Sequence, residues 1–211
     1  MKGLREHFLS FEDSFQSKFR IRILAGKEDK IGLNRLKEFN DQIHKSGGYD
    51  SNPLLCIDFD PWSTWIYVTD EKDKILSVQR IVEKTKENLL PVELAVILEE
   101  GQPKRYAVLE EGVADWNCVS FERSATGWKA AVKNFSAIAK LCLYRNYSKV
   151  YGFYNKEVPA IERIYKSNGA VESRVLSGDV YLPNYHINGN TVSARIIELD
   201  KTALQSVAMR L

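Results

Sequence analysis

The segment from Trp116 to Gly169 restricts the fold of this chain more than any other stretch. Residues 119–126 begin with apolar and polar residues in alternation, which is typical of an extended strand. Residues 128–142 then carry apolar side chains at helical spacing, and 149–154 form a second short apolar run. Residues 155–169 begin with an asparagine that suits a helix N-cap and end at a glycine. The segment therefore predicts strand, helix, strand and helix in succession.

The rest of the chain adds strands on both sides of that segment. The charged turn 70–73 separates the runs 64–69 and 74–82, as in a hairpin. Near the end of the chain, Asn-Gly-Asn at 188–190 predicts a closing antiparallel pair. The elements expected outside the segment are helices over 4–18, 27–46 and 91–98, an irregular stretch over 99–112, and strands over 19–24, 64–69, 74–82, 174–182 and 191–199. This order predicts an α/β fold (an α+β mixed sheet) with helices on both faces, in one domain over 1–211.

The composition fits one sizeable core. The chain has 211 residues, of which 44% are hydrophobic and 27% are charged, as in an ordinary globular domain. Its net charge of +2 is too small to indicate nucleic-acid binding. No run approaches the roughly 18 apolar residues of a membrane-spanning helix, and acidic residues interrupt every apolar run within 1–18. We therefore expect a cytoplasmic protein with no membrane span and no nucleic-acid partner.

The cysteines predict no metal site and no disulfide framework. Cys56, Cys118 and Cys142 cannot all pair within one chain, and none has metal-ligand spacing to another cysteine or to any of the three histidines. We expect three reduced, mostly buried thiols, because free cysteine often behaves as a small hydrophobic residue. The alternative is a nucleophilic Cys118, although no histidine lies near it in the sequence.

Three short motifs follow one another along the chain. They are an acidic Asp-Pro-Trp-Ser loop at 60–63 before a hairpin whose return strand, 75–81, contains an arginine, a Glu-Arg-Ser-Ala-Thr run at 122–126, and a helix ending in glycine at 162–169. In this order and spacing they resemble the GNAT acyltransferase superfamily, and within it the acyl-homoserine-lactone (autoinducer) synthases and the N-acyl amino acid synthases. The resemblance covers about residues 20–200 and implies a GNAT-like fold, with a central twisted mixed sheet and helices on both faces.

The resemblance implies an enzyme that transfers an acyl group from a thioester to an amine. We expect a long-chain acyl group, carried by acyl carrier protein or by CoA, and the amine of an amino acid as its acceptor. The donor is then a substrate, so no permanently bound cofactor is expected, and acyl carrier protein is the expected protein partner. Such a reaction requires orientation of the two groups, a proton acceptor and a donor to the oxyanion.

The catalytic residues that the resemblance implies lie at the end of the strand before 128–142. The family usually has a glutamate three residues before the strand-end arginine, Arg123, and this chain has Ser120 there. Glu122 is the nearest glutamate, but neighbouring residues of a strand point to opposite faces. A bulge that redirects Glu122, a water molecule, Ser120 or the substrate amine itself could therefore supply the base. Ser120, Glu122 and Arg123 are the catalytic candidates.

The start of the following helix is the expected phosphate site. Unpaired amides and the helix dipole favour an anion near Thr126, Gly127 and Trp128, and Lys129 adds a positive charge. The alternative is that Gly127 only makes a turn and Lys129 is solvated. The acetyl-CoA enzymes of the superfamily carry a Gln/Arg-x-x-Gly-x-Gly/Ala loop here. This chain has one glycine at a different spacing, which favours a carrier-protein donor.

The remaining site candidates are expected to bind the substrates. Arg80 and Arg123 suit bidentate recognition of the acceptor carboxylate or of the carrier arm, unless they form surface ion pairs. Asp60 is expected to anchor the acceptor amine or to orient Arg80, unless it only starts a turn. Aromatic residues are expected to line a channel for the acyl tail or, alternatively, to belong to the core: Trp62, Trp65, Trp116, Phe121, Phe153 and Tyr154.

An acidic carrier protein would need a basic surface. The residues expected to form it are Lys104, Arg105, Lys129, Lys133, Lys140, Arg145 and Lys149. Other functions remain open on the same motifs: an acyl-homoserine-lactone synthase that uses S-adenosylmethionine, a conventional acetyl-CoA N-acetyltransferase, or an inactive acyl-binding sensor.

Overall fold

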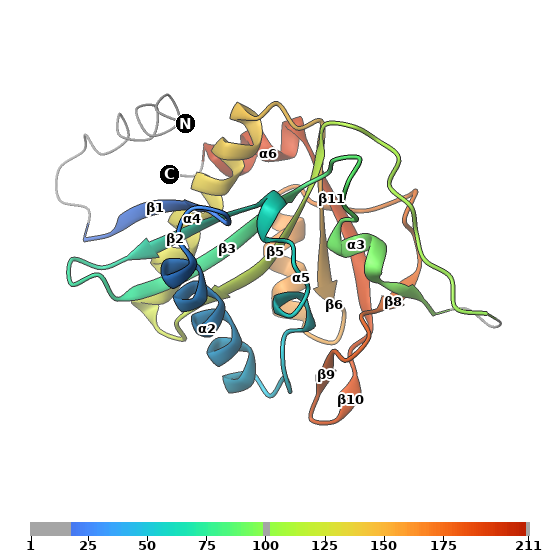
Figure 1. Cartoon of the computed structure of the whole chain (residues 1–211), viewed down its shortest axis with the longest axis horizontal. Coiled ribbons are helices and arrows are strands. Elements are labelled where there is room, and N and C mark those ends of the chain that lie inside the picture. Colours follow the sequence, from blue (N-terminus) through green and yellow to red (C-terminus); the bar gives the residue numbers. More distant parts are fainter. Residues whose placement is uncertain (1–17, 99–101, 210–211) are drawn as a thin grey trace.

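The computed structural model describes residues 18–98 and 102–209, whose strands form one large mixed sheet beside a small hairpin, β9–β10 (Figure 1). The order in the large sheet is β1-β2-β3-β5-β6-β11-β8-β4, with β7 also pairing to β11. The strands are β1 (Arg20–Ala25), β2 (Ser63–Thr69), β3 (Ile75–Glu83), β4 (Val96–Ile97), β5 (Val113–Phe121), β6 (Lys149–Asn155), β7 (Val171–Glu172), β8 (Asp179–Tyr181), β9 (His186–Ile187), β10 (Asn190–Thr191) and β11 (Ala194–Asp200). The helices are α2 (Lys30–Ser46), α3 (Pro91–Leu94), α4 (Ala125–Tyr144), α5 (Pro159–Ser167) and α6 (Lys201–Ala208), with short 3-10 turns η1 (Pro53–Leu55) and η2 (Asp60–Trp62).

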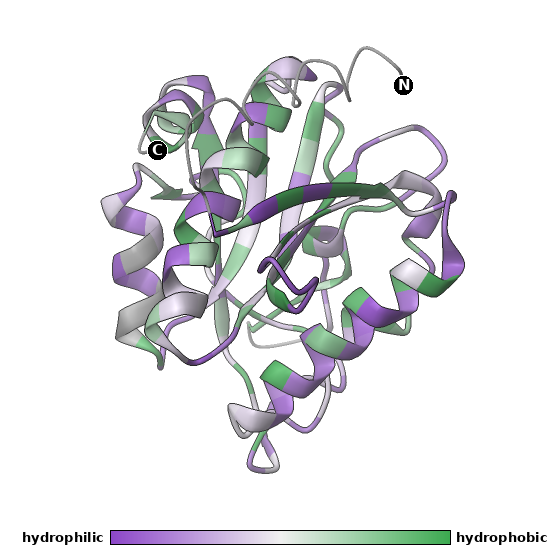
Figure 2. Cartoon of the chain, turned by 90° about the vertical axis from the view of Figure 1, so that its left-hand side faces the viewer, coloured by the Kyte–Doolittle hydropathy of each residue, from purple (hydrophilic) through white to green (hydrophobic). Residues whose placement is uncertain are grey.

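Helices cover both faces of the sheet. Successive residues of a strand point to opposite faces, and in β2 Trp65 packs with Leu33 and Leu36 of α2, whereas Ile66 packs in the same cluster as Ile138 of α4. Figure 2 views the molecule from the β1 edge, with α2 on one side of the sheet and α4 with α6 on the other. The predicted fold class, a mixed sheet with helices on both faces, is confirmed.

Helix α2 presents a partly polar face to the sheet. It begins at the N-cap Asp29, whose side chain accepts a hydrogen bond of 2.9 Å from the Gly32 amide. Its buried positions, Leu33, Leu36 and Asn40, are spaced three and four residues apart. Burial of Leu36, which is 2% exposed, contributes about 2 kcal/mol. The third buried position, Asn40, places a side-chain amide against the sheet where an apolar group would be usual.

Helix α4 begins in close contact with the end of β5. The N-cap Ser124 accepts a hydrogen bond of 3.0 Å from the Gly127 amide. A Cβ atom at Gly127 would lie 2.0 Å from the carbonyl oxygen of Glu122, so this position requires glycine. The helix starts at Ala125, earlier than the apolar periodicity from residue 128 predicts.

The two parallel strands at the centre of the sheet separate along their length. β5 and β6 pair only at Val113–Lys149, Ala114–Val150 and Asp115–Tyr151. Beyond these pairs β5 continues beside β3, and β6 continues beside β11. The C-terminal halves of β5 and β6 therefore have a gap between them in the hydrogen-bonded ladder.

A bulge bends β5 where the gap opens. Arg80 of β3 lies opposite Asn117, and Val78 lies opposite Ser120, so two residues of β5 face one residue of β3. One of the two, Cys118, has a φ of +52°, which is uncommon for a residue with a side chain. A bulge of this kind leaves backbone groups outside the ladder and turns the strand away from its neighbour.

Most of the elements expected from the first half of the chain are confirmed. The expected strands 19–24, 64–69 and 74–82 are β1, β2 and β3, and the expected helix 27–46 is α2. The helix expected over 4–18 lies outside the described residues, apart from its last position.

Five expectations for single elements were wrong in part. The strand expected over 119–126 is Val113–Phe121, and the helix expected from the N-cap Asn155 is Pro159–Ser167, because Asn155 is the last residue of β6. The helix expected over 91–98 is only Pro91–Leu94, and a short strand follows it. The strand expected over 174–182 is only Asp179–Tyr181; it does pair with β11, as expected. The turn at 188–190 joins β9 to β10 instead of joining that pair, because β9–β10 is a separate hairpin. The described part of the irregular stretch, 102–112, contains one isolated bridge.

Two general expectations concern the thiols and the membrane. Cys118 and Cys142 are buried, Cys56 is exposed, and all three are free thiols. Among residues 18–98 and 102–209, no helix is both long and apolar enough to span a bilayer.

Candidate functional site

A cavity of about 260 Å³ occupies the gap between β5 and β6. Residues 116–121 of β5 form one wall, and residues 153–155 of β6 form the other. The C-terminal end of α2 closes a third side through Ile43 and His44. Tyr49 and Tyr185, whose rings stack with centroids 5.1 Å apart, add an aromatic boundary. The splayed strands therefore enclose a mostly apolar space with a few polar groups.

His44 is the ionisable group best placed for proton transfer in this cavity. Its Nδ1 atom lies 2.9 Å from the Asn40 carbonyl oxygen and 3.4 Å from the Ser120 hydroxyl. A carbonyl oxygen only accepts, so we assign the ring proton to Nδ1, which leaves the lone pair on Nε2. Burial lowers the pKa of His44 below its ordinary value, so the ring is neutral at physiological pH. A neutral imidazole with an available Nε2 can act as a general base.

A set of neutral polar residues, here called the neutral cluster (Asn40, His44, Asn52 and Ser120), fixes this histidine against the bulge. Asn40 is fully buried and donates to the Cys118 carbonyl oxygen at 2.8 Å and to the Ser120 hydroxyl at 2.7 Å. Its own side-chain oxygen accepts from Asn52 at 2.8 Å. The cluster thus holds both the unusual backbone of β5 and the orientation of the imidazole.

No motif in the sequence indicated His44 as a site residue. A signal was available: Leu33, Leu36, Asn40 and His44 follow one another at helical spacing, so the inward face of α2 changes from apolar to polar toward its end. A polar side chain on the buried face of an amphipathic helix indicates a specific role.

The Cys118 thiol is unsuited to be a nucleophile. The residue lines the cavity but is only 5% exposed, and burial raises the pKa of its thiol. The thiolate is the reactive form of cysteine, so a raised pKa lowers reactivity. Its sulfur instead lies 3.7 Å from the side-chain nitrogen of Asn52.

The three predicted catalytic residues separate in the structure. Ser120 is 2% exposed and lines the cavity, where it accepts from Asn40. Arg123 is exposed, lines the cavity and lies against the end of α2, where a Cβ at Gly47 would come within 2.9 Å of its guanidinium. Glu122 lies outside the cavity lining and pairs with Lys74. The bulge lies before Ser120 and does not bring Glu122 into the cavity lining.

The predicted phosphate site lies at the edge of the cavity. Arg123 lines the cavity and immediately precedes Ser124, the N-cap of α4. The cap uses the Gly127 amide, which leaves the Thr126 amide without an acceptor among the described residues. Trp128 is 42% exposed and contacts Phe121 of the cavity wall edge-on, with centroids 5.7 Å apart. Lys129 is exposed in the same turn.

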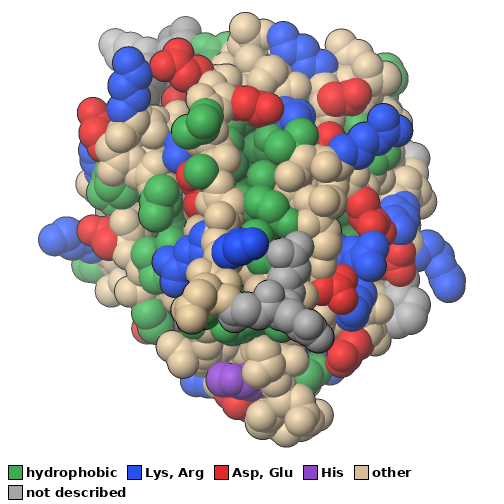
Figure 3. All heavy atoms as spheres, turned by 90° about the vertical axis from the view of Figure 1, so that its right-hand side faces the viewer, with side chains coloured by type: hydrophobic (Ala, Val, Ile, Leu, Met, Phe, Trp, Pro, Cys, Tyr) green, Lys and Arg blue, Asp and Glu red, His purple; other side chains and the backbone are tan. Residues whose placement is uncertain are grey.

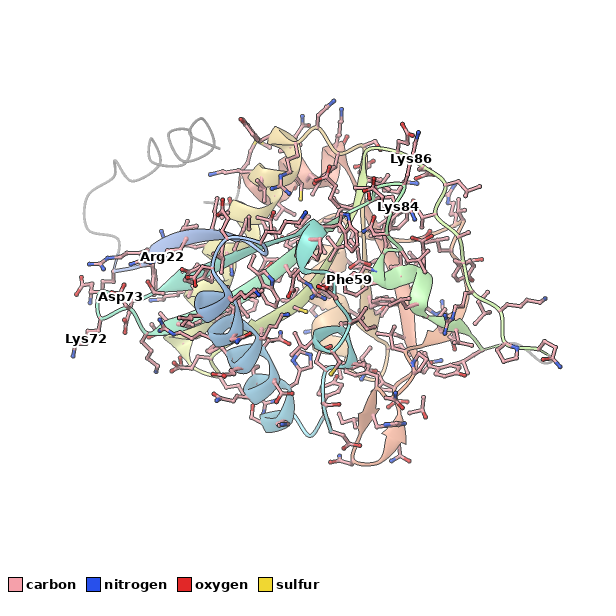
Figure 4. The ribbon with its side chains drawn as sticks, in the orientation of Figure 1. Arg22, Phe59, Lys72, Asp73, Lys84 and Lys86 are labelled. Carbon is pink, nitrogen blue, oxygen red and sulfur yellow. The ribbon has the colours of Figure 1, made fainter. Side chains whose placement is uncertain are left out.

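The structure places Arg80 in the interior, away from the cavity lining. It is 0% exposed and donates to the side-chain oxygen of Asn117 at 2.7 Å and to the Leu54 carbonyl at 3.2 Å. Its guanidinium lies 5.2 Å from the ring centre of Phe59, a residue labelled in Figure 4. One of its terminal nitrogens, Nη1, has no hydrogen-bond partner among the described residues.

Arg80 belongs to a second buried set, here called the charged cluster (Arg80, Asp115 and Asn117). Asn117 links the two charged residues, since its side-chain nitrogen donates to Asp115 at 2.7 Å. Burial is the largest influence on the pKa of Asp115 and raises it to about 7, although hydrogen bonds from Asn117 and the Val92 amide lower it. Only Asn117 of this cluster also lines the cavity.

Asp60 and Trp62 also lie outside the cavity lining. One carboxylate oxygen of Asp60 accepts from Lys37 at 2.7 Å, and the other is buried without a partner among the described residues. Trp62 packs against a core cluster that includes Phe59 and Val82. The structure therefore does not bring the acidic loop together with Arg123.

The predicted aromatic channel divides into two sets. Trp116, Phe121, Phe153 and Tyr154 line the cavity, whereas Trp62 and Trp65 belong to the core. The Tyr154 hydroxyl donates to Glu172 at 2.8 Å.

The expected basic surface is not one patch, because its residues lie on different parts of the sheet. Lys104 and Arg105 lie beside β4 at one edge of the sheet, whereas α4, which carries Lys129 and Lys133, packs on β1–β3. Lys149 pairs with Glu110 and Glu198 at 3.6 Å. Figure 3 shows basic and acidic side chains intermixed on the face toward β4 and β8. Among the residues described here, no three His, Cys, Asp or Glu side chains group as metal ligands would.

No protein-family model matches this chain, and no curated protein is similar to it in sequence. Solved structures do match. FeeM, an N-acyl amino acid synthase from uncultured soil microbes, aligns with a TM-score of 0.60 at 13% identity, over 92% of this chain and 97% of FeeM. BjaI, a CoA-dependent acyl-homoserine lactone synthase, aligns with a TM-score of 0.58 at 13% identity, over 91% of this chain and 89% of BjaI.

A third match is the spermidine N-acetyltransferase of Vibrio cholerae in complex with CoA and spermine. It aligns with a TM-score of 0.56 at 13% identity, over 90% of this chain and 99% of the acetyltransferase. At these identities the likeness establishes the fold: the chain has the GNAT fold that its motifs predicted.

Proposed function

We propose that this chain, which has the GNAT fold, is an N-acyltransferase that joins a long-chain acyl group to the amine of an amino acid. The observation that carries the proposal is the cavity between β5 and β6, where the neutral His44 faces a bulged strand. FeeM, named as an N-acyl amino acid synthase, has the same fold.

The proposed reaction uses His44 as the base. In its uncharged form the acceptor amine attacks the thioester carbonyl carbon, a C–N bond forms, and the C–S bond then breaks. His44 Nε2 accepts the proton that the amine loses, and the imidazolium returns it to the departing thiolate. A backbone amide of the bulge at Cys118–Val119, outside the regular ladder, donates to the oxyanion, a contribution of about 3 kcal/mol for one such donor.

The donor is proposed to approach from the start of α4. The Thr126 amide, Arg123 and Lys129 offer a phosphate a helix N-terminus and two positive charges. A pantetheine arm entering beside Arg123 would reach the gap between β5 and β6, and an acyl tail would contact aromatic side chains such as Trp116 and Phe153. Both acyl carrier protein and CoA present this arm.

The charges of the cavity favour an acceptor that has a carboxylate. Among the described residues that line it, Arg123 and His44 are the basic side chains, and no aspartate or glutamate is present. A polyamine or a sulfonium compound would meet no carboxylate there, whereas an amino acid carboxylate could pair with Arg123. This supports an amino acid acceptor over spermidine or S-adenosylmethionine.

Product analysis tests the proposal. The full chain is incubated with acyl carrier thioesters and acyl-CoA of several chain lengths and with an amino acid mixture, and mass spectrometry is used to detect N-acyl amino acids. We expect an N-acyl product in the wild type and a strong reduction in H44Q. H186Q is the matched control, because His186 lies on β9 outside the cavity lining. Absence of product with every chain length contradicts the proposal.

A further inference from the structure

A second hollow, here called the α2 hollow, lies at the other end of α2, beside the outer ends of β1, β2 and β3. Its volume is about 180 Å³. Figure 4 labels Arg22 and Asp73 close together at this end of the sheet. Arg35 precedes His44 by nine residues of α2, about 13 Å along the helix axis, so the hollow is separate from the cavity. Its polar wall residues are Arg22, Arg35, Tyr67, Thr69 and Asp73.

Positive charge exceeds negative charge around the α2 hollow. Asp73 accepts from Arg22 at 2.6 Å and from Arg20 at 3.3 Å through the same carboxylate oxygen. Arg35 lines the hollow without an ion-pair or hydrogen-bond partner in the described part of the chain. These three arginines therefore stand against two carboxylates, Asp73 and the N-cap Asp29 beside Gly32 of the lining. An anion that enters the hollow still meets an excess of positive charge.

Two hydroxyl groups of β2 belong to the same wall. Tyr67 lies opposite Arg22 and Thr69 lies opposite Arg20 in the β1–β2 register, so these side chains share one face of the sheet. Thr69 is 2% exposed, and its hydroxyl has no hydrogen-bond partner among the described residues. A buried hydroxyl without a partner is destabilising, and an acceptor atom bound in the hollow would satisfy it.

We propose that the α2 hollow binds the phosphate or carboxylate group of a small anion through Arg35 and Arg22, with the hydroxyls of Tyr67 and Thr69 as further donors. Guanidinium groups bind such oxyanions with paired hydrogen bonds. The volume is below the roughly 300 Å³ at which pockets for drug-sized ligands begin, so the site suits a phosphate-sized anion and not a nucleotide. It takes no part in the proposed acyl transfer.

Isothermal titration of the full chain tests this site. Inorganic phosphate and succinate are titrated separately at constant ionic strength, with chloride as the balancing anion. We expect saturable binding of at least one anion, and R35Q to weaken it by roughly tenfold, because it removes a charged hydrogen-bond donor. R174Q removes an exposed arginine outside the hollow and is expected to leave the affinity unchanged. Binding of phosphate alone assigns a phosphate ligand, and binding of succinate alone assigns a carboxylate ligand.

A second variant, T69V, tests the site without changing its charge. T69V is nearly isosteric and removes only the unpartnered hydroxyl, so we expect it to fold at least as stably as the wild type and to bind the anion severalfold more weakly. An unchanged affinity in T69V overturns the assignment of that hydroxyl. Absence of saturable binding for both anions, or equal affinities in R35Q and R174Q, overturns the site.

Discussion

The neutral cluster and the charged cluster use neighbouring stretches of β5 in opposite ways. The neutral cluster, which includes His44 and Ser120, lies where β5 has left β6, and it borders a cavity. The charged cluster begins at Asp115, the last residue of β5 that pairs with β6, and it buries an arginine and a carboxylate. The two clusters differ in their access to the cavity: His44 and Ser120 line it, whereas Arg80 and Asp115 do not. We infer that the neutral cluster serves chemistry, and that the charged cluster holds the strands that form the walls.

The largest expected effect comes from removal of the arginine of the charged cluster. At pH 8, where Asp115 is ionised in the wild type, R80M keeps a long apolar side chain but leaves this carboxylate buried without its positive neighbour, so we expect a loss of about 3–5 kcal/mol in the free energy of unfolding. Urea denaturation measures it. In the double variant R80M/D115N the carboxylate is gone as well, and part of the loss should be recovered. If R80M alone were as stable as the wild type, the charged cluster would not have the structural role that distinguishes it from the neutral cluster.

The second effect is a pH dependence of stability caused by Asp115. Its pKa is about 7 in the folded chain and about 3.8 when unfolded, so the folded state binds more protons between these values. The contribution of Asp115 to the free energy of unfolding is fully present below about pH 4. It decreases by roughly 1.4 kcal/mol per pH unit above that value and is lost once the pH has risen through 7. Unfolding experiments at a series of pH values should show this slope in the wild type. D115N should lack it, and an identical slope in D115N would assign it to another group.

A third effect separates catalysis from stability in the neutral cluster. H44Q removes the proposed base, and we expect the rate of N-acyl product formation to fall by at least about 100-fold. The unfolding free energy should change much less than in R80M, because His44 is only partly buried. Steady-state rates and urea denaturation on the same preparation provide both numbers. A rate loss that is matched by a loss of folded protein would contradict the proposed role.

The smallest effect is expected at Ser120. S120A removes one of two acceptors of the Asn40 amide, while the Cys118 carbonyl remains as the other. We expect a loss of about 1 kcal/mol in stability and a severalfold change in rate. The exposed S177A is a matched control for both measurements. A rate loss in S120A as large as that in H44Q would make Ser120, and not His44, the central residue.

The sequence predicted what depends on local periodicity. The alternation in 19–24 and the helical spacing in 27–46 report burial on one face, and the structure has β1 and α2 there. The motif at 122–126 likewise marked the end of β5 and the start of α4, where the cavity and the helix N-terminus meet.

Non-local pairing decided what the sequence could not predict. The bulge at Cys118 follows from the register between β5 and β3, and the gap follows from the divergence of β5 and β6, which are joined through a long helix. Arg80 was expected to bind the acceptor carboxylate or the carrier arm, or else to form a surface ion pair, but the strands and loops around it bury it completely. His44 lies beside Ser120 although 76 residues separate them, a contact that no local pattern encodes.

The pH dependence of acyl transfer tests the central claim most directly. If His44 takes the proton from the amine, kcat/KM of the wild type, expressed per uncharged amine, falls on the acidic side with an apparent pKa below 6.5, because burial lowers the pKa of this imidazole. H44Q should lose that acidic limb and keep only a low residual rate, while H186Q keeps it. An H44Q enzyme with the wild-type rate and the same acidic limb would contradict the account.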